Sequence, residues 1–412
     1  MTQLLDLGFV RRQFPALDGE WTFFDNAGGS QILGPVADRM RDYLLHSNVQ
    51  LGASYEVSQQ AGERVAAATE AMAAYVNAAH ASEVILGASS TLLTRIMSLC
   101  LAETFQPGDE IIVTNCDHEA NIGAWVDLAK RGLTVKTWRL NPRSWRLEIA
   151  DLRALLSART RLVALTHASN VLGAIHPIRD IAQVVHEHGA LVYVDGVAFA
   201  PHRQIDVQAL DVDFYVFSFY KVYGPHAAML YGRREHLLRT PGMNHFFIPQ
   251  EQIPYKFQPG GVNYEACYSM LGLWDYLAAL AEAHGRAGLR QDRAGQLAFA
   301  FDRIAAHEEA LARLLLEFLA AKRHVRIIGL PECDRAARVP TVSFVVDGVA
   351  SDAIVRQVDE HRIGIRFGDF YARRLIDDLG LAPRNGVVRV SMVHYNSPAE
   401  VEHLIEVLDR II

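Results

Sequence analysis

Short apolar runs recur through the first part of the chain and predict the strands of a sheet. The runs span residues 111–114, 162–166, 191–195, 214–218 and 228–231, and helical stretches separate them. This alternation is typical of βαβ units. Because the runs are apolar throughout, helices should cover both faces of the strands, which favours a mostly parallel central sheet. Ligands are then expected at the carboxyl ends of the strands.

The second part of the chain has a different pattern. Apolar residues follow one another at steps of three and four between residues 284 and 323, which predicts a long connector helix. A smaller α/β unit is expected after it, with strands at 340–347 and 386–392 and a helix near 351–361. Ser397, Pro398 and Glu400 mark the start of a final helix as N-cap, first-turn proline and capping-box glutamate.

The expected fold is therefore α/β, with two domains in 412 residues. Residues 1–285 should form an N-terminal segment and a large domain with a mostly parallel central sheet. Residues 286–412 should form the connector helix and a smaller α/β domain.

Composition and charge narrow the choice of partners. The net charge is -7 and no basic block is present, which argues against nucleic acid or an anionic membrane as the main partner. The start, MTQLLDLGFVRRQF, does not resemble a secretory signal, so a cytoplasmic location is expected. Four widely spaced cysteines, without a C-x-x-C pair, favour reduced thiols over disulfides or a metal site.

Lys221 is the first candidate for chemistry. Between Phe214 and Gly232 it is the only formally charged side chain, in a stretch otherwise suited to burial. Only five of the 40 basic residues are lysines, so an amine at this position suggests a nucleophile. The competing interpretation is a lysine that extends from a strand end to solvent.

Asp195 ends the apolar run ALVYVD, so we expect it at the carboxyl edge of a central strand. By itself it could equally be a helix cap or a turn residue. Together with Lys221 it indicates pyridoxal phosphate (PLP), because this cofactor needs an imine-forming lysine and a carboxylate for its pyridinium nitrogen.

The stretch from Asp195 to Lys221, VDGVAFAPHRQIDVQALDVDFYVFSFYKVYGP, resembles the class V aminotransferase and cysteine desulfurase family. The segments FFDNAGGSQ, NCDHEANIGAW, THASNVLGAIHP and GVVRVSMVHYNSPAEVEHL extend the resemblance over nearly the whole chain. It is greatest to bacterial cysteine desulfurase-like proteins, a branch distinct from the true desulfurases. The resemblance implies fold type I, PLP held as a Schiff base on Lys221, and a homodimer with active sites near the subunit boundary.

The resemblance also implies roles for further residues. The His118 ring would stack on PLP, and Asn170 would lie near the ring hydroxyl and the substrate. The phosphate would be held by residues at the start of a helix and beside the lysine, namely Ser89, Ser90, Ser218 and Tyr220. Arg389 would grip the substrate carboxylate, which suits a planar guanidinium. Capping, core packing and an ordinary ion pair are the competing interpretations.

Several positions depart from the desulfurase pattern. Ala198 replaces a glutamine near the cofactor, and near residue 261 a glycine in PGGVN replaces a hydroxyl residue that often reaches the neighbouring subunit's phosphate. The segment QLGASY at 50–55 lacks the usual histidines. In IRFGDFYARRL, Tyr371 stands at the cysteine of the family's R-x-G-x-x-C-A pattern. A phenol oxygen cannot form a persulfide.

These residues predict a PLP enzyme that acts on an amino acid. Lys221 would move the Cα proton while Asp195 keeps the pyridinium charged and Arg389 holds the carboxylate. We favour C–S bond cleavage that releases sulfide directly, with pyruvate as the second product when cysteine is the substrate. An aminotransferase, an epimerase and a non-catalytic PLP-binding protein remain alternatives. A nucleotide-binding protein is disfavoured because no G-x-G-x-x-G or Walker motif is present.

Overall fold

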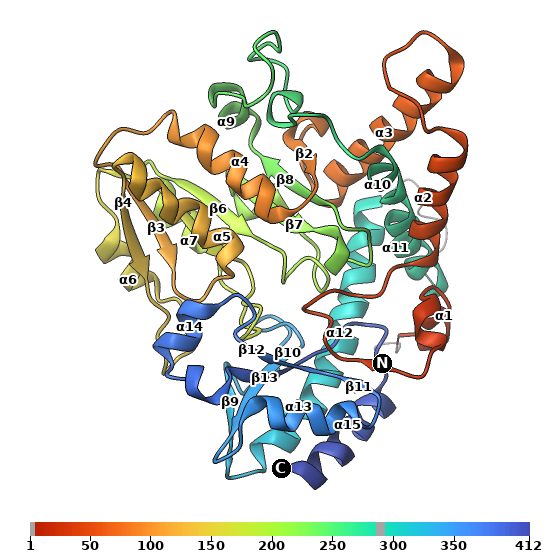
Figure 1. Cartoon of the computed structure of the whole chain (residues 1–412), viewed down its shortest axis with the longest axis vertical. Helices are drawn as coiled ribbons and strands as arrows, with labels where there is room; N and C mark the ends of the chain where they lie inside the picture. The colour runs from red at the N-terminus through yellow and green to blue at the C-terminus, as the bar shows by residue number, and fades with distance from the viewer. Residues whose placement is uncertain (1–4, 286–292) are drawn as a thin grey trace.

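The computed structural model describes residues 5–285 and 293–412. In these residues a central seven-stranded sheet has the order β2-β8-β7-β6-β5-β3-β4 (Figure 1). Its strands are β2 (Val84–Gly87), β3 (Glu110–Thr114), β4 (Thr134–Trp138), β5 (Thr160–Thr166), β6 (Leu191–Asp195), β7 (Phe214–Ser218) and β8 (Ala228–Gly232). Strands β4, β3, β5, β6 and β7 are parallel, and β8 is antiparallel to both of its neighbours. The predicted mostly parallel α/β sheet is confirmed.

Both faces of this sheet are buried. On β5, Val163 and Leu165 belong to one hydrophobic core, whereas Leu162 and Ala164 belong to a second core on the opposite face. The second core includes residues of α4 (Ser90–Ala102) and α5 (Glu119–Val126), and the first includes residues of α7 (Ile178–His186). This burial explains why the strands are unbroken apolar runs.

The C-terminal unit contains an antiparallel four-stranded sheet with the order β12-β13-β10-β9. The strands are β9 (Val325–Ile328), β10 (Thr341–Val346), β12 (Arg366–Gly368) and β13 (Val387–Ser391). Helices α13 (Ser351–Asp359) and α15 (Pro398–Ile411) contribute to its core, and α14 (Arg373–Asp378) lies between β12 and β13 in sequence. Ser397 and Glu400 form the expected capping box at the start of α15.

A long helix connects the two units. Helix α11 (Leu271–Ala283) precedes it, and the connector itself is α12 (Arg293–Ala320). The connector helix was expected to start near residue 284, but residues 284 and 285 form the turn that ends α11. The predicted domain boundary at residue 286 lies outside the described residues. Helix α12 supplies Leu297 and Phe301 to the core of the large sheet and Leu311 and Leu315 to the core of the small one.

The N-terminal segment lies against the C-terminal unit. Strand β1 (Thr22–Phe23) pairs in parallel with β11 (Ile363–Gly364), which lies in the lower part of Figure 1. The remaining helices are α1 (Leu7–Arg11), α2 (Gly34–His46), α3 (Glu56–Tyr75), α6 (Ile149–Leu155), α8 (Val207–Leu210), α9 (Arg234–Arg239) and α10 (Tyr264–Ser269).

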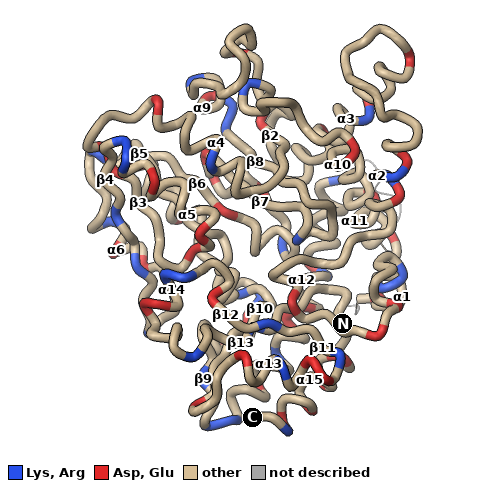
Figure 2. Tube along the Cα trace, in the orientation of Figure 1, with Lys and Arg blue, Asp and Glu red and all other residues tan. Residues whose placement is uncertain are grey.

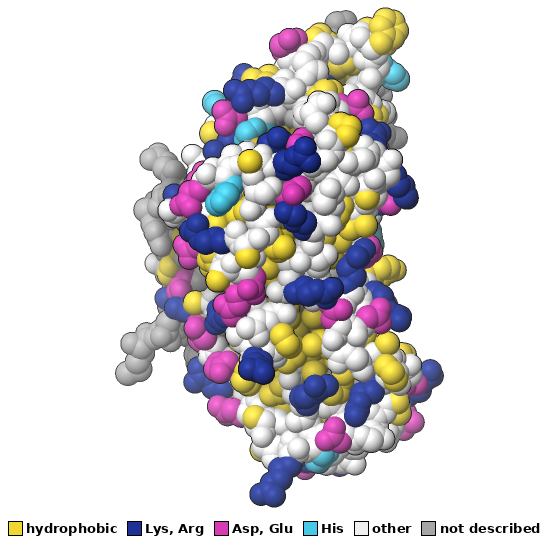
Figure 3. Space-filling model, turned by 90° about the vertical axis from the view of Figure 1, so that its left-hand side faces the viewer, with side chains coloured by type: hydrophobic (Ala, Val, Ile, Leu, Met, Phe, Trp, Pro, Cys, Tyr) yellow, Lys and Arg dark blue, Asp and Glu magenta, His cyan; other side chains and the backbone are white. Residues whose placement is uncertain are grey.

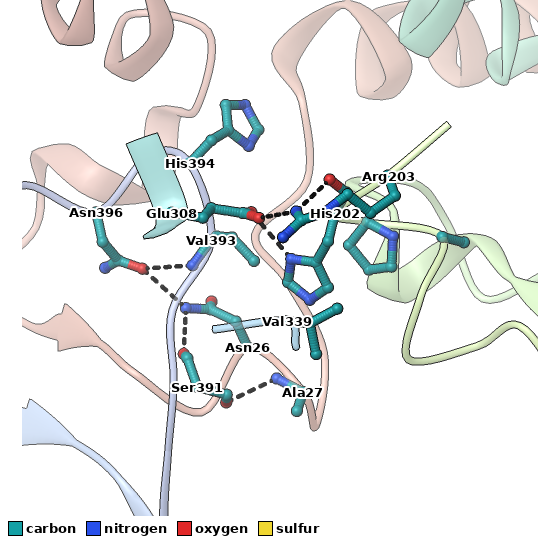
Figure 4. A network of polar contacts seen from close by, with 12 residues as sticks. Asn26, Ala27, His202, Arg203, Glu308, Val339, Ser391, Val393, His394 and Asn396 are labelled. Carbon is teal, nitrogen blue, oxygen red and sulfur yellow. Dashed lines mark hydrogen bonds and ion pairs between the residues drawn. The ribbon is translucent and has the colours of Figure 1, made fainter. Parts of the chain in front are cut away.

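Buried polar contacts connect these parts (Figure 4). Glu308 of α12 is fully buried and accepts hydrogen bonds from His202, at 2.9 Å, and Arg203, at 3.0 Å, on the large domain. Nearby, the Asn26 amide donates to the Ser391 carbonyl at 2.9 Å. Satisfied buried groups therefore join the connector helix to the large domain and the N-terminal segment to the small domain.

Charged residues of both signs are distributed over the whole chain trace (Figure 2), and the face in Figure 3 carries acidic and basic side chains side by side. Among the helices of the described residues, none combines the length and the apolar character needed to cross a bilayer.

Candidate active site

Two adjoining cavities of about 410 and 600 Å³ lie where strands β5, β6 and β7 end. They share His118, Asn170, Tyr220 and Lys221. The first is otherwise lined by large-domain residues: Ser90, Thr91, Ala120, Thr166, Asp195, Val197 and Ala198. The second is otherwise lined by the N-terminal segment and the small domain: Ala27, Gly28, Arg366, Phe367, Gly368, Asp369, Phe370, Tyr371 and Arg389. The site thus forms where three parts of the chain meet.

Lys221 ends a single 3-10 turn, Phe219–Lys221, that follows β7 directly. Its side chain is buried, and its Nζ atom makes no hydrogen bond to any residue in the ranges 5–285 and 293–412. Burial lowers the pKa of this amine, and the charge of Arg389 lowers it further, against the opposing effects of Asp195 and Asp25. The neutral, nucleophilic form of the amine is therefore populated at a lower pH than in a solvated lysine.

Asp195 is the last residue of β6, and its Oδ1 atom accepts a hydrogen bond from the Val197 amide at 2.8 Å. Burial raises the pKa of its carboxyl, and Lys221 acts in the opposite direction. A second buried carboxyl lies close by. Asp117 accepts hydrogen bonds from Thr114 Oγ1 and Asn121 Nδ2, and burial raises its pKa to about 7. The sequence analysis did not single out Asp117.

His118 is the N-cap of α5. Its Nδ1 atom accepts a hydrogen bond from the Ala120 amide at 3.0 Å, so the neutral ring carries its proton on Nε2. Burial, with the charges of Lys221 and Arg389, lowers the pKa of this imidazole to about 3. The ring is consequently neutral at physiological pH.

Asn170 lies at the junction of the two cavities. Its Nδ2 atom donates to the Phe370 carbonyl at 2.9 Å, and its backbone carbonyl accepts from Arg389 Nη1 at 3.1 Å. Its side-chain Oδ1 atom is buried and has no hydrogen-bond partner among the described residues. A buried unpaired acceptor is costly, so this atom is a natural contact for a ligand donor.

The hydroxyl groups predicted near a phosphate gather at the start of α4. Ser89 is the N-cap, and its hydroxyl accepts from the Leu92 amide at 3.2 Å. Ser90 and Thr91 line the first cavity, and the buried Ser218 hydroxyl donates to Ser90 Oγ at 3.0 Å. The Tyr220 ring stacks on His226 with 5.0 Å between ring centroids. Sequence reasoning missed Thr91, which follows the predicted serines directly.

Arg389 lies on β13, with only 2% of its side chain exposed. Its Nη2 atom donates to Asp25 Oδ1 at 2.8 Å, and its guanidinium carbon is 3.8 Å from the centre of the Phe370 ring. Burial lowers the pKa of the guanidinium, and Asp25 opposes that effect. Sequence reasoning missed this contact with Asp25, although it recognised the segment that contains Asp25.

The turn that contains Tyr371 has unusual backbone geometry. Phe370 and Tyr371 are both left-handed, with φ of 53° and 60°, which is costly for residues with a side chain. Contacts to the large domain hold the turn, since the Tyr371 carbonyl accepts from the Glu119 amide at 2.7 Å. The Tyr371 ring is 70% exposed, its centre lies 5.1 Å from that of the His118 ring, and the two ring planes are inclined by 28°.

No cysteine is among the described residues that line the two cavities. Cys100, Cys116 and Cys267 are buried elsewhere, and burial raises the pKa of the Cys116 thiol. Cys333 is partly exposed and donates to the Glu309 carbonyl of α12 at 2.9 Å.

Comparison with known proteins supplies relatives for this fold and site. Residues 22–404 match the family described as aminotransferase class-V. An aminotransferase-like protein, FGM3, from Gibberella zeae is 43% identical, with 98% of each chain covered. A cysteine desulfurase-like protein, ustD, from Aspergillus flavus is 35% identical over all of this chain and 92% of its own.

The apo structure of a cysteine desulfurase from Thermococcus onnurineus superposes with a TM-score of 0.87. It covers 100% of this chain and 99% of its own at 24% identity, so it supports the fold. Together these matches agree with the predicted α/β architecture. The chain therefore belongs to the aminotransferase class-V family, which includes the cysteine desulfurases and whose members use PLP.

Proposed function

We propose that this chain is a PLP-dependent enzyme that acts on a free amino acid, with PLP bound through Lys221. The observation that carries the proposal is the state of the Lys221 amine. It is buried, it has no hydrogen-bond partner in the described residues, and it lines both cavities, between Asp195 on one side and Arg389 on the other. An amine in this state is the kind of nucleophile that a carbonyl cofactor requires.

The residues of the first cavity fit PLP. Asp195 Oδ2 accepts no hydrogen bond from the described residues, so it is free for a pyridinium N–H, and the orphaned Asn170 Oδ1 is free for a ring substituent. The His118 ring would lie against the cofactor ring. Ser90 and Thr91 at the start of the 13-residue helix α4 suit the phosphate, with Ser89, Ser218 and Tyr220 beside them.

The chain's own residues account for binding and proton transfer. When bound, PLP withdraws electrons from the amino acid and so makes its Cα proton acidic. Arg389 would hold the substrate carboxylate at the far side of the second cavity. Lys221 Nζ, whose pKa is lowered by burial, would take the Cα proton. The neutral His118 adds no positive charge that would compete with Arg389 for the carboxylate.

We further propose that the enzyme cleaves a C–S bond without a persulfide. L-Cysteine and water would give sulfide, pyruvate and ammonium, a reaction that needs no oxidant or reductant. Two observations support this. Tyr371 lines the cavity at the position where the desulfurase pattern has cysteine, and no cysteine is found among the described lining residues. The desulfurase-like relative at 35% identity is consistent with sulfur chemistry.

Product analysis tests the proposal. The purified, PLP-loaded protein is incubated with L-cysteine, and sulfide, pyruvate and alanine are measured. We expect equal amounts of sulfide and pyruvate, because the phenol of Tyr371 cannot accept sulfur. Alanine together with protein-bound persulfide would instead establish a desulfurase.

Lys221→Ala is the control for this experiment. The variant should form no product, and borohydride reduction of the wild-type protein should place the pyridoxyl group on Lys221 in peptide mapping. A pyridoxyl group on another lysine would disprove the assignment of Lys221. With other amino acids, transfer of the amino group to an added keto acid would identify an aminotransferase, and formation of the opposite enantiomer would identify an epimerase.

We also propose that the protein is a homodimer, as the family resemblance implies. Large apolar side chains on one surface segment support this, since Phe246 is 99% exposed and Phe247 is 65% exposed.

A further inference from the structure

We infer that Asp25 is a positioning residue, which orients Arg389 so that its free N–H groups receive a ligand carboxylate. The inference rests on the proposed function, because it assumes that Arg389 binds the substrate. Asp25 comes from the N-terminal segment and Arg389 from β13 of the small domain, so the pair joins two distant parts of the chain at the second cavity, which Arg389 lines.

The contacts of Arg389 leave its guanidinium little freedom. Nη2 donates to Asp25 Oδ1 at 2.8 Å, Nη1 donates to the Asn170 carbonyl at 3.1 Å, and the Phe370 ring covers one face of the group. A guanidinium has five donors, so N–H groups remain for a further anion. A buried cation without an anionic partner would be strongly destabilising, and Asp25 is the carboxylate that supplies this partner.

The two residues that follow Asp25 are hydrogen-bonded to Ser391 of the small domain (Figure 4). The Ala27 amide donates to Ser391 Oγ at 2.8 Å, and the Asn26 side chain donates to the carbonyls of Phe23 and Ser391, both at 2.9 Å. Asp25 also forms a parallel bridge with Ser391. Because Ser391 lies two residues after Arg389 on the same strand, these bonds fix the backbone of Asp25 beside the strand that carries Arg389.

Gly28 provides the space that the Asp25 carboxylate occupies. A Cβ atom at position 28 would lie 2.8 Å from Asp25 Oδ2 and 3.0 Å from Oδ1. These distances are shorter than van der Waals contact, so any side chain at position 28 would push the carboxylate away from Arg389. The second oxygen of Asp25 is also 3.4 Å from Arg366 Nη1, but that arginine is more than half exposed and its contribution is weak.

The test compares two probes that differ only in the carboxylate. The PLP-loaded protein is titrated with L-serine and with ethanolamine, and binding is followed by the change in visible absorbance. We expect Asp25→Ala to weaken L-serine binding by about tenfold, which corresponds to the loss of one charge-assisted hydrogen bond. Ethanolamine binding should change by less than about twofold on the same reasoning.

Two further variants distinguish the effect of the orientation of Arg389 from the effect of the negative charge of Asp25. Asp25→Asn keeps an oxygen that can accept from Nη2, so it should retain most of the L-serine affinity. Gly28→Ala keeps the charge but displaces the carboxylate, so it should weaken L-serine binding as Asp25→Ala does. Asp18→Ala, at an exposed position of the same segment, is the matched control and should bind both probes as the wild type does.

Equal loss of both probes in Asp25→Ala, or tighter L-serine binding in that variant, would overturn the inference. If the wild type does not prefer L-serine to ethanolamine, the carboxylate role of Arg389 in the proposed function fails instead. In that case, thermal unfolding of the ligand-free protein tests whether Asp25 and Arg389 form a pair. Asp25→Ala should lower Tm less in an Arg389→Met background than in the wild type, and additive effects would disprove the pairing.

Discussion

At the scale of single residues, burial determines the chemistry of this site. The Lys221 amine and the Asp195 and Asp117 carboxyls are all buried. Removal from water favours the neutral form of each group, so it lowers the pKa of the amine and raises the pKa of both carboxyls. In Arg389 burial lowers the pKa of the guanidinium, and the contact with Asp25 opposes that effect. The same amino acids on a solvated surface would have none of these properties.

Asp117 provides a test of this effect through pH. Its pKa rises from 3.8 to about 7 on folding, so between these values the folded protein holds a proton that the unfolded chain has released. Stability is therefore lost progressively as the pH rises from about 3.8 to about 7, and the loss is complete once the buried carboxyl has ionised. Asp117→Asn should raise Tm relative to the wild type at pH 8, and by less at pH 5.5. Calorimetry at both values measures this, and a gain that is larger at low pH would contradict it.

At the scale of elements, the site depends on how the strands end. Strand β6 ends at Asp195 and continues into Gly196, where a Cβ atom would lie 2.1 Å from the ring of Tyr215. The Tyr215 hydroxyl is hydrogen-bonded to His167 Nδ1 at 2.8 Å, and both side chains are buried. The ring therefore cannot move away, and only glycine allows the chain to leave the strand here with Asp195 at its end.

Gly196→Ala should consequently lower Tm by several degrees and reduce the amount of PLP that the purified protein retains, because the collision displaces Asp195 or Tyr215. Gly62→Ala is the matched control. Gly62 lies inside α3 with open space around its Cβ position, so alanine there should be neutral or stabilising by up to about 1 kcal/mol. Similar melting curves for the two variants would show that the contact at position 196 relaxes without cost.

At the scale of the whole molecule, the site lies where the large domain, the small domain and the N-terminal segment meet. The large domain supplies Lys221 and Asp195, the small domain supplies Arg389 and the turn at 370–371, and the N-terminal segment supplies Asp25. Helix α12 contributes to the cores of both units, and Glu308 on it binds His202 and Arg203. The relative position of the two units is thus set by burial and by polar contacts outside the site.

Light scattering of the purified protein tests the proposed homodimer. We expect a mass of twice the 45.8-kDa chain at micromolar concentration. Replacing Phe246 and Phe247 with aspartate should shift this mass toward a single chain, because exposed aromatic side chains mark association surfaces. Trp21→Asp, at another exposed aromatic position, should leave the mass unchanged. A single-chain mass for the wild type at every concentration would contradict the proposal.

The sequence by itself determined the class of fold and named the central candidates. Unbroken apolar runs are visible in sequence because both faces of β5, β6 and β7 are buried, and the capping box of α15 is visible because its bonds are local. Lys221 and Asp195 could be named because a charged residue at the end of an apolar run is a local feature, which the sequence shows without any knowledge of distant contacts. Their roles, with those of His118, Asn170 and Arg389, remain predictions.

Only the tertiary structure decided which groups meet. Asp25 and Arg389 are separated by 364 positions in sequence, and Phe370 reaches Asn170 across 200 positions. No periodicity or local motif encodes such pairs, because they depend on how two sheets and the N-terminal segment pack. The left-handed backbone at Phe370 and Tyr371 likewise depends on contacts with the large domain, since neither residue type favours that conformation.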